Sequence, residues 1–206
     1  MQPLVSGVTL LPSAGACFRT WHPARGPLRS LLKNEQGEAY YWLIGPPAAL
    51  WEAVEPGITL GRLRRRAEAL QMGQRLDSLL LEWHQAGWIE VRGGAPADAL
   101  TRPSVAPGMP PAPQVRGPMA APPPSLTPCD LEDVQRWMSK QGLAFSASWA
   151  LDQPTPDLRQ AVERLDFLRR SGVFRVHFTG QALDRHHQHI RQAARAQGFE
   201  CVGPDP

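Results

Sequence analysis

The sequence predicts an α+β protein with three parts: a small N-terminal domain of a three-stranded sheet and three helices, a Pro-rich linker, and a small α/β C-terminal domain. Residues 39–91 indicate the first part, because an apolar aromatic run is followed there by three helical patterns and a short closing strand. Residues 95–127 hold ten of the chain's 22 prolines, which is typical of a linker. Residues 128–206 alternate helical patterns with short β-type runs, which favours a mainly parallel sheet. We therefore place the domains at residues 1–94 and 128–206.

Three β-type runs supply the predicted N-terminal sheet. The first two, residues 7–11 and 16–20, are separated by the turn composition Pro12-Ser13-Ala14-Gly15, so we expect them to pair as a hairpin. The third, residues 39–44 (AYYWLI), ends at Gly45 and follows a turn at residues 34–37. Its continuous apolar character predicts a buried strand.

Start and stop signals divide residues 46–87 into three helices. Pro46 suits the first turn of the first helix, where a missing N–H costs nothing. Thr59 can cap the second helix, and Gly87 ends the third. A stripe at i, i+3, i+4, i+7 predicts the buried face of the third helix: Leu76, Leu79, Leu80 and Trp83. A short strand at residues 88–91 follows, so the N-terminal domain has a winged-helix-like outline.

The order of these parts carries a family resemblance. A strand and an apolar-striped helix precede the turn Glu55-Pro56-Gly57 and then Ile58-Thr59-Leu60, and a leucine helix ends in QAGWIE at residues 85–90. Over roughly residues 5–92 this resembles PqqD and the related recognition elements of ribosomally synthesised, post-translationally modified peptide (RiPP) biosynthesis. Domains of that family bind the leader segment of a precursor peptide and present its core to a modifying enzyme. The resemblance therefore implies a peptide-binding domain in a natural-product biosynthesis complex.

The resemblance also implies where the peptide binds. In such domains the peptide adds as a further strand along the third strand, and side chains of the third helix line the groove. Main-chain bonds along the edge give affinity, and side-chain pockets give selectivity. For each aromatic of this strand the alternative is a core or surface role, because neighbouring strand residues point to opposite faces. Mapped onto this sequence, one wall is Tyr41, Trp42 and Leu43, and the other is Ser78, Leu81, Glu82 and Gln85.

Composition limits the partners and the compartment. There are 22 Lys plus Arg against 19 Asp plus Glu, and we attribute the Arg and Ala bias to codon composition rather than to nucleic-acid binding. Cys17, Cys129 and Cys201 lie far apart without a CxxC pair, which predicts neither a disulfide framework nor a standard zinc or iron–sulfur site. No apolar run approaches the roughly 20 residues of a membrane span, and no signal peptide is evident. We expect a cytoplasmic protein without nucleic-acid or membrane partners.

The C-terminal region begins with residues 127–130 (TPCD), which predict a capping box with proline at the first helical position. A second helix opens at residues 155–157 and ends at Gly172. β-type and helical patterns alternate from Gly172 to the last residues of the sequence. The expected strands are residues 143–149, 173–178 and 199–202, and the last helix spans residues 182–197.

Part of this region resembles another family. Residues 168–180, with Ile190, residues 193–195 and residues 198–199 downstream, are similar to the second βα unit of radical SAM peptide-modifying enzymes. The three-cysteine cluster motif of that family is absent here. At residues 180–183 this chain has Gly-Gln-Ala-Leu where the family has Gly-Gly-Glu-Pro. We therefore expect a truncated or convergent unit without the cluster and without catalysis.

The candidate metal ligands of this region are His177, His186, His189 and Cys201. Two of these histidines are three apart on a helix and the other two residues lie on flanking strands, so the set could converge on zinc or iron. The simpler interpretation is a solvated polar helix face, since no carboxylate or cysteine pair completes the set. We predict no metal and no cofactor, and no nucleophile elbow, phosphate loop or HExxH motif indicates catalysis.

The main hypothesis is a non-catalytic partner protein. Its N-terminal domain would bind a leader peptide, and its C-terminal domain would dock on a separate modifying enzyme, such as a radical SAM or a multinuclear non-haem iron enzyme. The alternative is a winged-helix DNA-binding transcription regulator, in which arginines of the second helix meet phosphates. Asp77 and Glu82 on the third helix oppose it. The arginines of the second helix that would meet phosphates are Arg62, Arg64, Arg65 and Arg66.

A third hypothesis is a weak enzyme built on the C-terminal domain, which predicts bound metal.

Overall fold

The computed structural model describes residues 8–35, 37–93, 127–150, 158–179 and 185–203. Within these residues the protein is a mixed α+β structure with six helices and three small sheets. The N-terminal elements are β1 (Thr9–Pro12), β2 (Ala16–Trp21), β3 (Arg29–Asn34), β4 (Tyr40–Ile44), α1 (Pro46–Val54), β5 (Ile58–Thr59), α2 (Leu60–Ala69), α3 (Gly73–Gln85) and β6 (Ile89–Arg92). The C-terminal elements are β7 (Thr127–Cys129), α5 (Leu131–Lys140), β8 (Ser146–Ala150), α6 (Leu158–Arg170), β9 (Arg175–Thr179), α7 (Arg185–Ala196) and β10 (Glu200–Val202).

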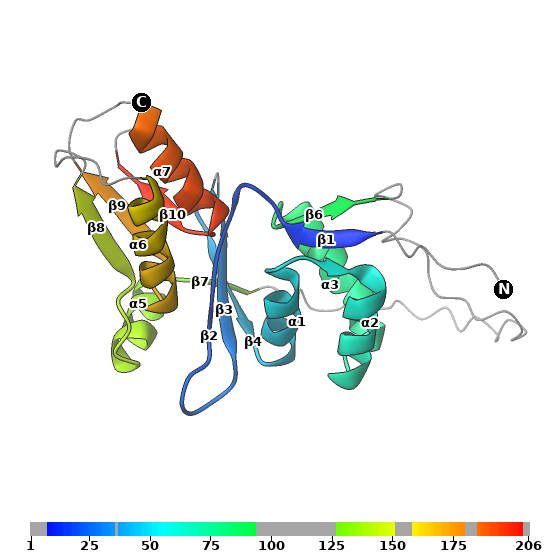
Figure 1. Cartoon of the computed structure of the whole chain (residues 1–206). Coiled ribbons are helices and arrows are strands. Elements are labelled where there is room, and N and C mark those ends of the chain that lie inside the picture. The colour runs from blue at the N-terminus through cyan, green and yellow to red at the C-terminus, as the bar shows by residue number, and fades with distance from the viewer. Residues whose placement is uncertain (1–7, 36, 94–126, 151–157, 180–184, 204–206) are drawn as a thin grey trace, which may run out of the picture.

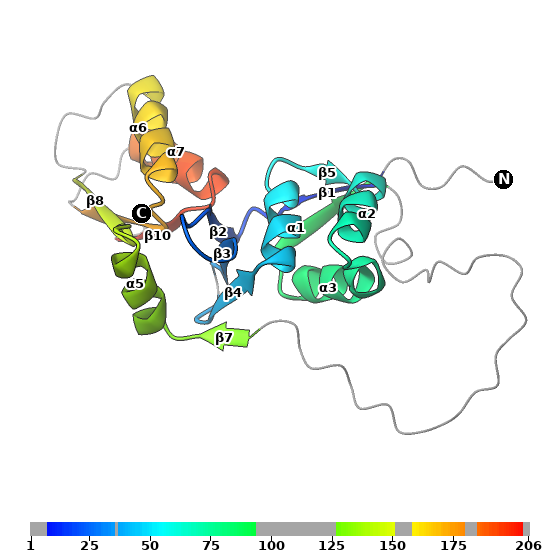
Figure 2. The same cartoon turned by 90° about the horizontal axis from the view of Figure 1, so that it is seen from below.

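The central element is an antiparallel sheet with the strand order β2-β3-β4-β7. Figure 1 shows it between two groups of elements, with α1, α2 and α3 on one side and α6 and α7 on the other. The view in Figure 2 agrees and adds α5 to the second side. Because both faces of this sheet are covered, its strands carry apolar residues on both faces.

The face of the central sheet toward α1, α2 and α3 belongs to the largest hydrophobic core. The predicted stripe of α3 is confirmed, since Leu76, Leu79, Leu80 and Trp83 are all buried in this core. The rings of Trp51 and Trp83 meet edge to face at 5.2 Å between centroids. Packing of this stripe, more than helix propensity, stabilises helices of such length.

The opposite face of the central sheet forms a second core together with residues beyond position 127. Further contacts join β2 to the same region: Trp21 Nε1 donates to the carbonyl of Gly172 at 3.1 Å, and the backbone N–H of Phe18 donates to that of Gly198 at 2.9 Å. The N-terminal and C-terminal parts thus share a core. Its members are Cys17, Trp21, Leu31 and Tyr40 from one part and Val134, Met138, Phe145 and Phe174 from the other.

The C-terminal sheet has the order β10-β9-β8, and both of its pairings are parallel, as predicted. Its own core lies against α6 and α7 and includes Trp149, Leu165, Phe178 and Ile190. Parallel strands require crossover connections, and α6 and α7 are those that the structure describes here.

Two expectations about the N-terminal strands were wrong. The runs at residues 7–11 and 16–20 do not pair as a hairpin, because β1 pairs antiparallel with β5 and β6 while β2 pairs with β3. The chain changes sheets at residues 12–15, so this turn composition marks a crossing between sheets. The strand β3 was not predicted from the sequence, because its Arg29 and Lys33 interrupt the apolar pattern.

The capping box expected at residues 127–130 is also wrong. Residues 127–129 form β7, and α5 begins only at Leu131, with Asp130 at its N-cap position. The tertiary contact with β4 overrides the local helix-start signal. The remainder of the predicted linker, residues 95–126, lies outside the described residues.

Candidate functional site

The outer edge of β4 is the predicted peptide site, and the structure places β7 on part of it. The two strands are antiparallel, with Tyr40 opposite Cys129, Tyr41 opposite Pro128 and Trp42 opposite Thr127. Among the described residues, no strand pairs with Leu43 or Ile44 along this edge. The edge therefore accepts an added strand, and that strand is a segment of the same chain.

The side chains of β4 alternate between the two faces of the sheet. Tyr41 packs edge to face against Trp88, with 5.0 Å between ring centroids, and Leu43 is 1% exposed in the core beside α1, α2 and α3. Trp42 points the other way and packs against Trp137 at 5.2 Å. The predicted wall of Tyr41, Trp42 and Leu43 is therefore not a single wall, and of these three only Tyr41 is a partly exposed side chain on the α3 side.

The predicted wall on α3 is accessible. Ser78, Leu81 and Gln85 are exposed and Glu82 is half-buried. Their spacing of three, four and seven residues from Ser78 puts them on one stripe of the helix, away from the stripe that is buried in the core. Leu81 is 37% exposed and is the apolar side chain of this stripe, so it is the residue of the stripe that an apolar side chain of a partner could contact.

A pocket of about 400 Å³ lies where β4 begins and α3 ends. Asn34 fixes one side of it by donating from Nδ2 to the carbonyl of Ala86 at 3.1 Å. Gly87 adopts a φ of 71°, and a Cβ at this position would lie 2.7 Å from Asn34 Nδ2, so the turn requires glycine. The helix end at Gly87 and a turn at residues 34–37 were predicted from the sequence, but the bond from Asn34 to Ala86 and the pocket were not. The lining residues are Asn34, Gly37, Glu38, Ala39, Tyr41, Ala86 and Trp88.

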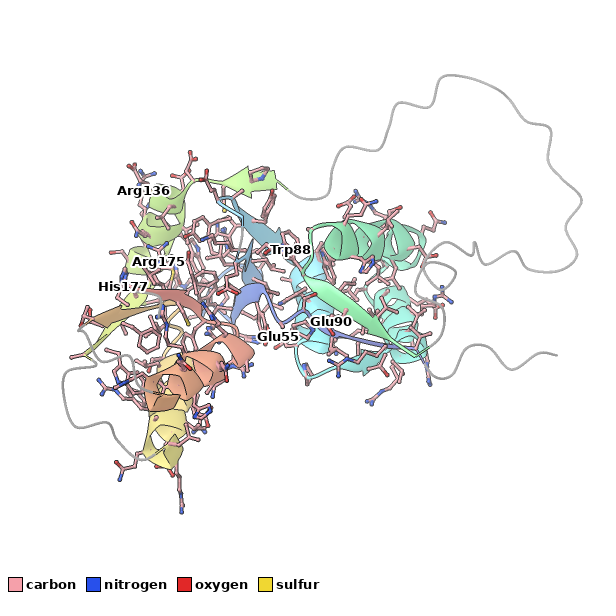
Figure 3. All side chains as sticks on the ribbon, turned by 90° about the horizontal axis from the view of Figure 1, so that it is seen from above. Glu55, Trp88, Glu90, Arg136, Arg175 and His177 are labelled. Carbon is pink, nitrogen blue, oxygen red and sulfur yellow. The ribbon has the colours of Figure 1, made fainter. Side chains whose placement is uncertain are left out.

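A larger cleft of about 540 Å³ separates β1, β6 and the turn after α1 from α6 and α7. Glu55 and Glu90 are two of its acidic residues, and Figure 3 shows both between the two halves of the protein. Glu55 accepts a hydrogen bond from Thr20 at 2.5 Å and lies 3.6 Å from Arg169. Burial nevertheless raises the pKa of Glu55 above its ordinary value of 4.5. Both acidic residues of the cleft are paired within it, since Glu90 lies 3.2 Å from Arg92.

The structure describes the side chains of three of the four candidate metal ligands. His177 and Cys201 are half-buried on β9 and β10, His189 is exposed on α7, and the side chain of His186 lies outside the described residues. Among the residues that the structure describes, no three His, Cys, Asp or Glu side chains form a group that could hold a metal ion.

The three cysteines are free. Burial raises the pKa of the Cys17 and Cys201 thiols to about 12 and that of Cys129 to about 11. Nucleophilic attack needs the thiolate, so these thiols are poor candidates for a nucleophile at neutral pH.

None of the described helices combines the length and the apolar character needed to cross a bilayer. Comparison with known proteins found no protein-family model, curated protein or solved structure that matches this chain. The β4 edge, the exposed stripe of α3 and the pocket beside Tyr41 and Trp88 are therefore the basis for assigning a function.

Proposed function

We propose that this chain is a non-catalytic partner protein of RiPP biosynthesis, with a PqqD-like N-terminal region that binds the leader of a precursor peptide. The leader adds as a strand at the outer edge of β4, and the chain delivers it to a separate modifying enzyme in the cytoplasm. The observation that carries the proposal is the antiparallel pairing of β7 with Tyr40–Trp42. A three-residue segment that contains a proline already adds to this edge, and a longer peptide without proline has more backbone bonds to offer.

The surroundings of the edge suit a peptide with alternate side chains in contact. One side chain of an added strand would enter the pocket lined by Tyr41 and Trp88, where two aromatic rings offer a large apolar contact area. Another would lie against the exposed Leu81 on α3. Main-chain pairing supplies affinity that is independent of sequence, and these two contacts supply the selectivity.

The chemistry belongs to the partner enzyme in this proposal. A radical SAM enzyme or a multinuclear non-haem iron enzyme would modify the core peptide, and the C-terminal region beyond β7 would dock on it. The three free cysteines suit a reducing compartment, where disulfides are rare.

The test uses fluorescein-labelled, overlapping 15-residue peptides that cover the short open reading frames beside the gene. Fluorescence anisotropy with the full chain identifies any peptide that binds. Leu81→Asp then places a charge at the proposed anchor, which typically costs about 2 kcal/mol or more of binding, or roughly 30-fold in Kd. Leu158→Asp is the matched control, because Leu158 is 38% exposed on α6, away from β4.

The expected result is a large loss of affinity for Leu81→Asp, none for Leu158→Asp, and an unchanged melting temperature for both variants. Equal binding by Leu81→Asp and the unmodified protein would rule out this site.

The DNA-binding alternative has less support, because Arg64 donates to Asp77 at 3.4 Å and Arg66 to the carbonyl of Ala49 at 3.2 Å. Submicromolar, steeply salt-dependent binding to random duplex would reverse this preference.

A further inference from the structure

The strand β7 lies on the edge that the proposed function assigns to the leader peptide. Figure 2 shows β7 at the margin of the central sheet, beside β4 and directly before α5. β7 runs antiparallel to β4. An added peptide strand would pair with the same edge of β4. A leader peptide and β7 therefore compete for the backbone groups of Tyr40 and Trp42.

β7 is held by few interactions. It has three residues, of which Pro128 is exposed and Cys129 is half-buried. Proline has no N–H, so the Tyr41–Pro128 pair exchanges no hydrogen bonds, and the bonds between the strands fall on the pairs that flank it. Proline in a strand is tolerated at sheet edges. In the described part of this strand, Cys129 is the side chain that packs against the shared core.

The other end of β7 is anchored. Asp130 follows it at the N-cap of α5, and α5 buries Val134 and Met138 in the shared core. Trp137 of the same helix packs against Trp42. A displaced β7 therefore stays close to β4, because α5 tethers it, and its effective concentration at the edge remains high.

We propose that β7 is an internal occupant of the peptide-binding edge and that a leader peptide binds by displacing residues 127–129 from β4. This inference rests on the proposed function for the identity of the incoming strand. Its consequence is a lower apparent affinity, because only the fraction of molecules with β7 released can accept the peptide. The chain then favours peptides that contact both the pocket at Trp88 and the α3 stripe over those that offer backbone pairing alone.

The first test releases β7 and needs no leader peptide. Cys129→Pro removes the backbone donor opposite Tyr40, and Cys129→Ala is the matched control that removes the thiol but keeps the N–H. Hydrogen exchange should show the Trp42 amide exchanging about 10-fold faster in Cys129→Pro than in Cys129→Ala. The amides of Leu31 and Leu32 on the central β3 report on the sheet itself and should not change.

A probe peptide in trans extends this test. A synthetic peptide with the sequence of residues 123–131 should shift the Trp42 amide resonance of Cys129→Pro at concentrations at which it leaves Cys129→Ala unchanged. Unaltered Trp42 exchange in Cys129→Pro, together with no shift by the peptide, would show that β7 does not control access to the edge and would overturn the inference.

The second test locks β7 in place. Tyr40→Cys puts a thiol opposite Cys129, where directly opposed Cα atoms are about 5.5 Å apart, within the range that a disulfide spans. The peptide found by anisotropy is then measured against the diamide-oxidised and the reduced form of this one variant, so each preparation is its own control. Oxidation should lower the affinity at least about 10-fold.

The outcomes separate the two proposals. Equal affinity for the oxidised and reduced forms would overturn displacement and leave the leader-binding function standing. Binding to the reduced form alone supports both proposals. If no peptide binds either form, the leader-binding function fails, and the Trp42 exchange rates still decide whether β7 is a displaceable occupant of the edge.

Discussion

The hydroxyl of Tyr40 on β4 lies 3.1 Å from each carboxylate oxygen of Glu200 on β10. Arg175 donates to the same carboxylate from Nε at 2.7 Å, and Lys33 pairs with its other oxygen. Glu200 is 6% exposed, so this cluster is a buried polar contact between the central sheet and the C-terminal sheet. The strand β4, whose edge we propose as the peptide site, is thereby held by the C-terminal region through its Tyr40 side chain.

Glu200→Gln should destabilise the protein strongly. The substitution removes the charge that balances Lys33 and Arg175, and breaking a buried pair by removing one partner costs about 3 to 5 kcal/mol. Urea unfolding followed by tryptophan fluorescence measures the change. Glu132→Gln on the exposed side of α5 is the control and should change the free energy of unfolding by less than about 0.5 kcal/mol.

The same carboxylate predicts acid sensitivity. Burial alone would raise the pKa of Glu200, but the hydrogen bonds from Arg175 and Lys33 outweigh it and hold this pKa below 4.5. The unfolded state therefore binds the proton first as pH falls, and stability is lost below about pH 4.5. Unfolding titrations between pH 3 and 6 should show this loss, and Glu200→Gln should make the curve flatter below pH 4.5. An unchanged slope in the variant would assign the acid sensitivity to other carboxylates.

Glu55 should make stability depend on pH in the opposite sense to Glu200, and above pH 4.5 rather than below it. Burial raises its pKa above 4.5 in the folded state in spite of the hydrogen bond from Thr20 and the nearby Arg169. The folded state therefore holds this proton longer, so stability falls as pH rises from about 4.5 through the folded pKa. Glu55→Gln, which keeps an acceptor for Thr20, should remove this decline. Stability curves of the two proteins that stay parallel above pH 4.5 would contradict the prediction.

Gly87 links the end of α3 to the pocket. Gly87→Ala would hold an alanine at a φ of 71° and place its Cβ 2.7 Å from Asn34 Nδ2, so we expect a loss of more than about 1 kcal/mol of stability. Gly61→Ala is the matched control, because Gly61 lies in α2 with nothing within 4 Å of its added Cβ. The control should stabilise the protein by about 0.5 to 1 kcal/mol. Thermal melts of both variants decide the comparison.

The elements that the sequence predicted best are those with a local signal. The helices of residues 46–85 follow from periodic apolar residues and the strand at Tyr40–Ile44 from a continuous apolar run, and the structure has them. β3 was missed because its charged residues are satisfied by distant partners: Arg29 lies over the Trp42 ring at 5.5 Å, and Lys33 pairs with Glu200. Single-sequence periodicity cannot reveal such partners.

The part of the candidate site that has a local sequence signal could also be predicted. The exposed stripe of α3 follows from helix geometry, because residues off the buried stripe must face outward. The wall on β4 depends on which face of the sheet each residue takes and on what covers it, and here α5 covers Trp42. The occupancy of the edge by β7 depends on a contact between positions about 87 residues apart, and no local pattern specifies it.

Substitutions at Leu80 and Leu81 on α3 should separate an effect on folding stability from an effect on peptide binding. Leu80 is fully buried and Leu81 is 37% exposed, although the two are neighbours in the sequence. Leu80→Ala leaves a cavity in the core beside Trp83 and should cost about 2 to 5 kcal/mol of stability. Leu81→Ala should change the free energy of unfolding by less than about 0.5 kcal/mol and still weaken peptide binding, because it shortens the proposed anchor. Urea unfolding and peptide anisotropy on both variants test this. Equal destabilisation by the two changes would mean that Leu81 serves the core and would remove it from the site.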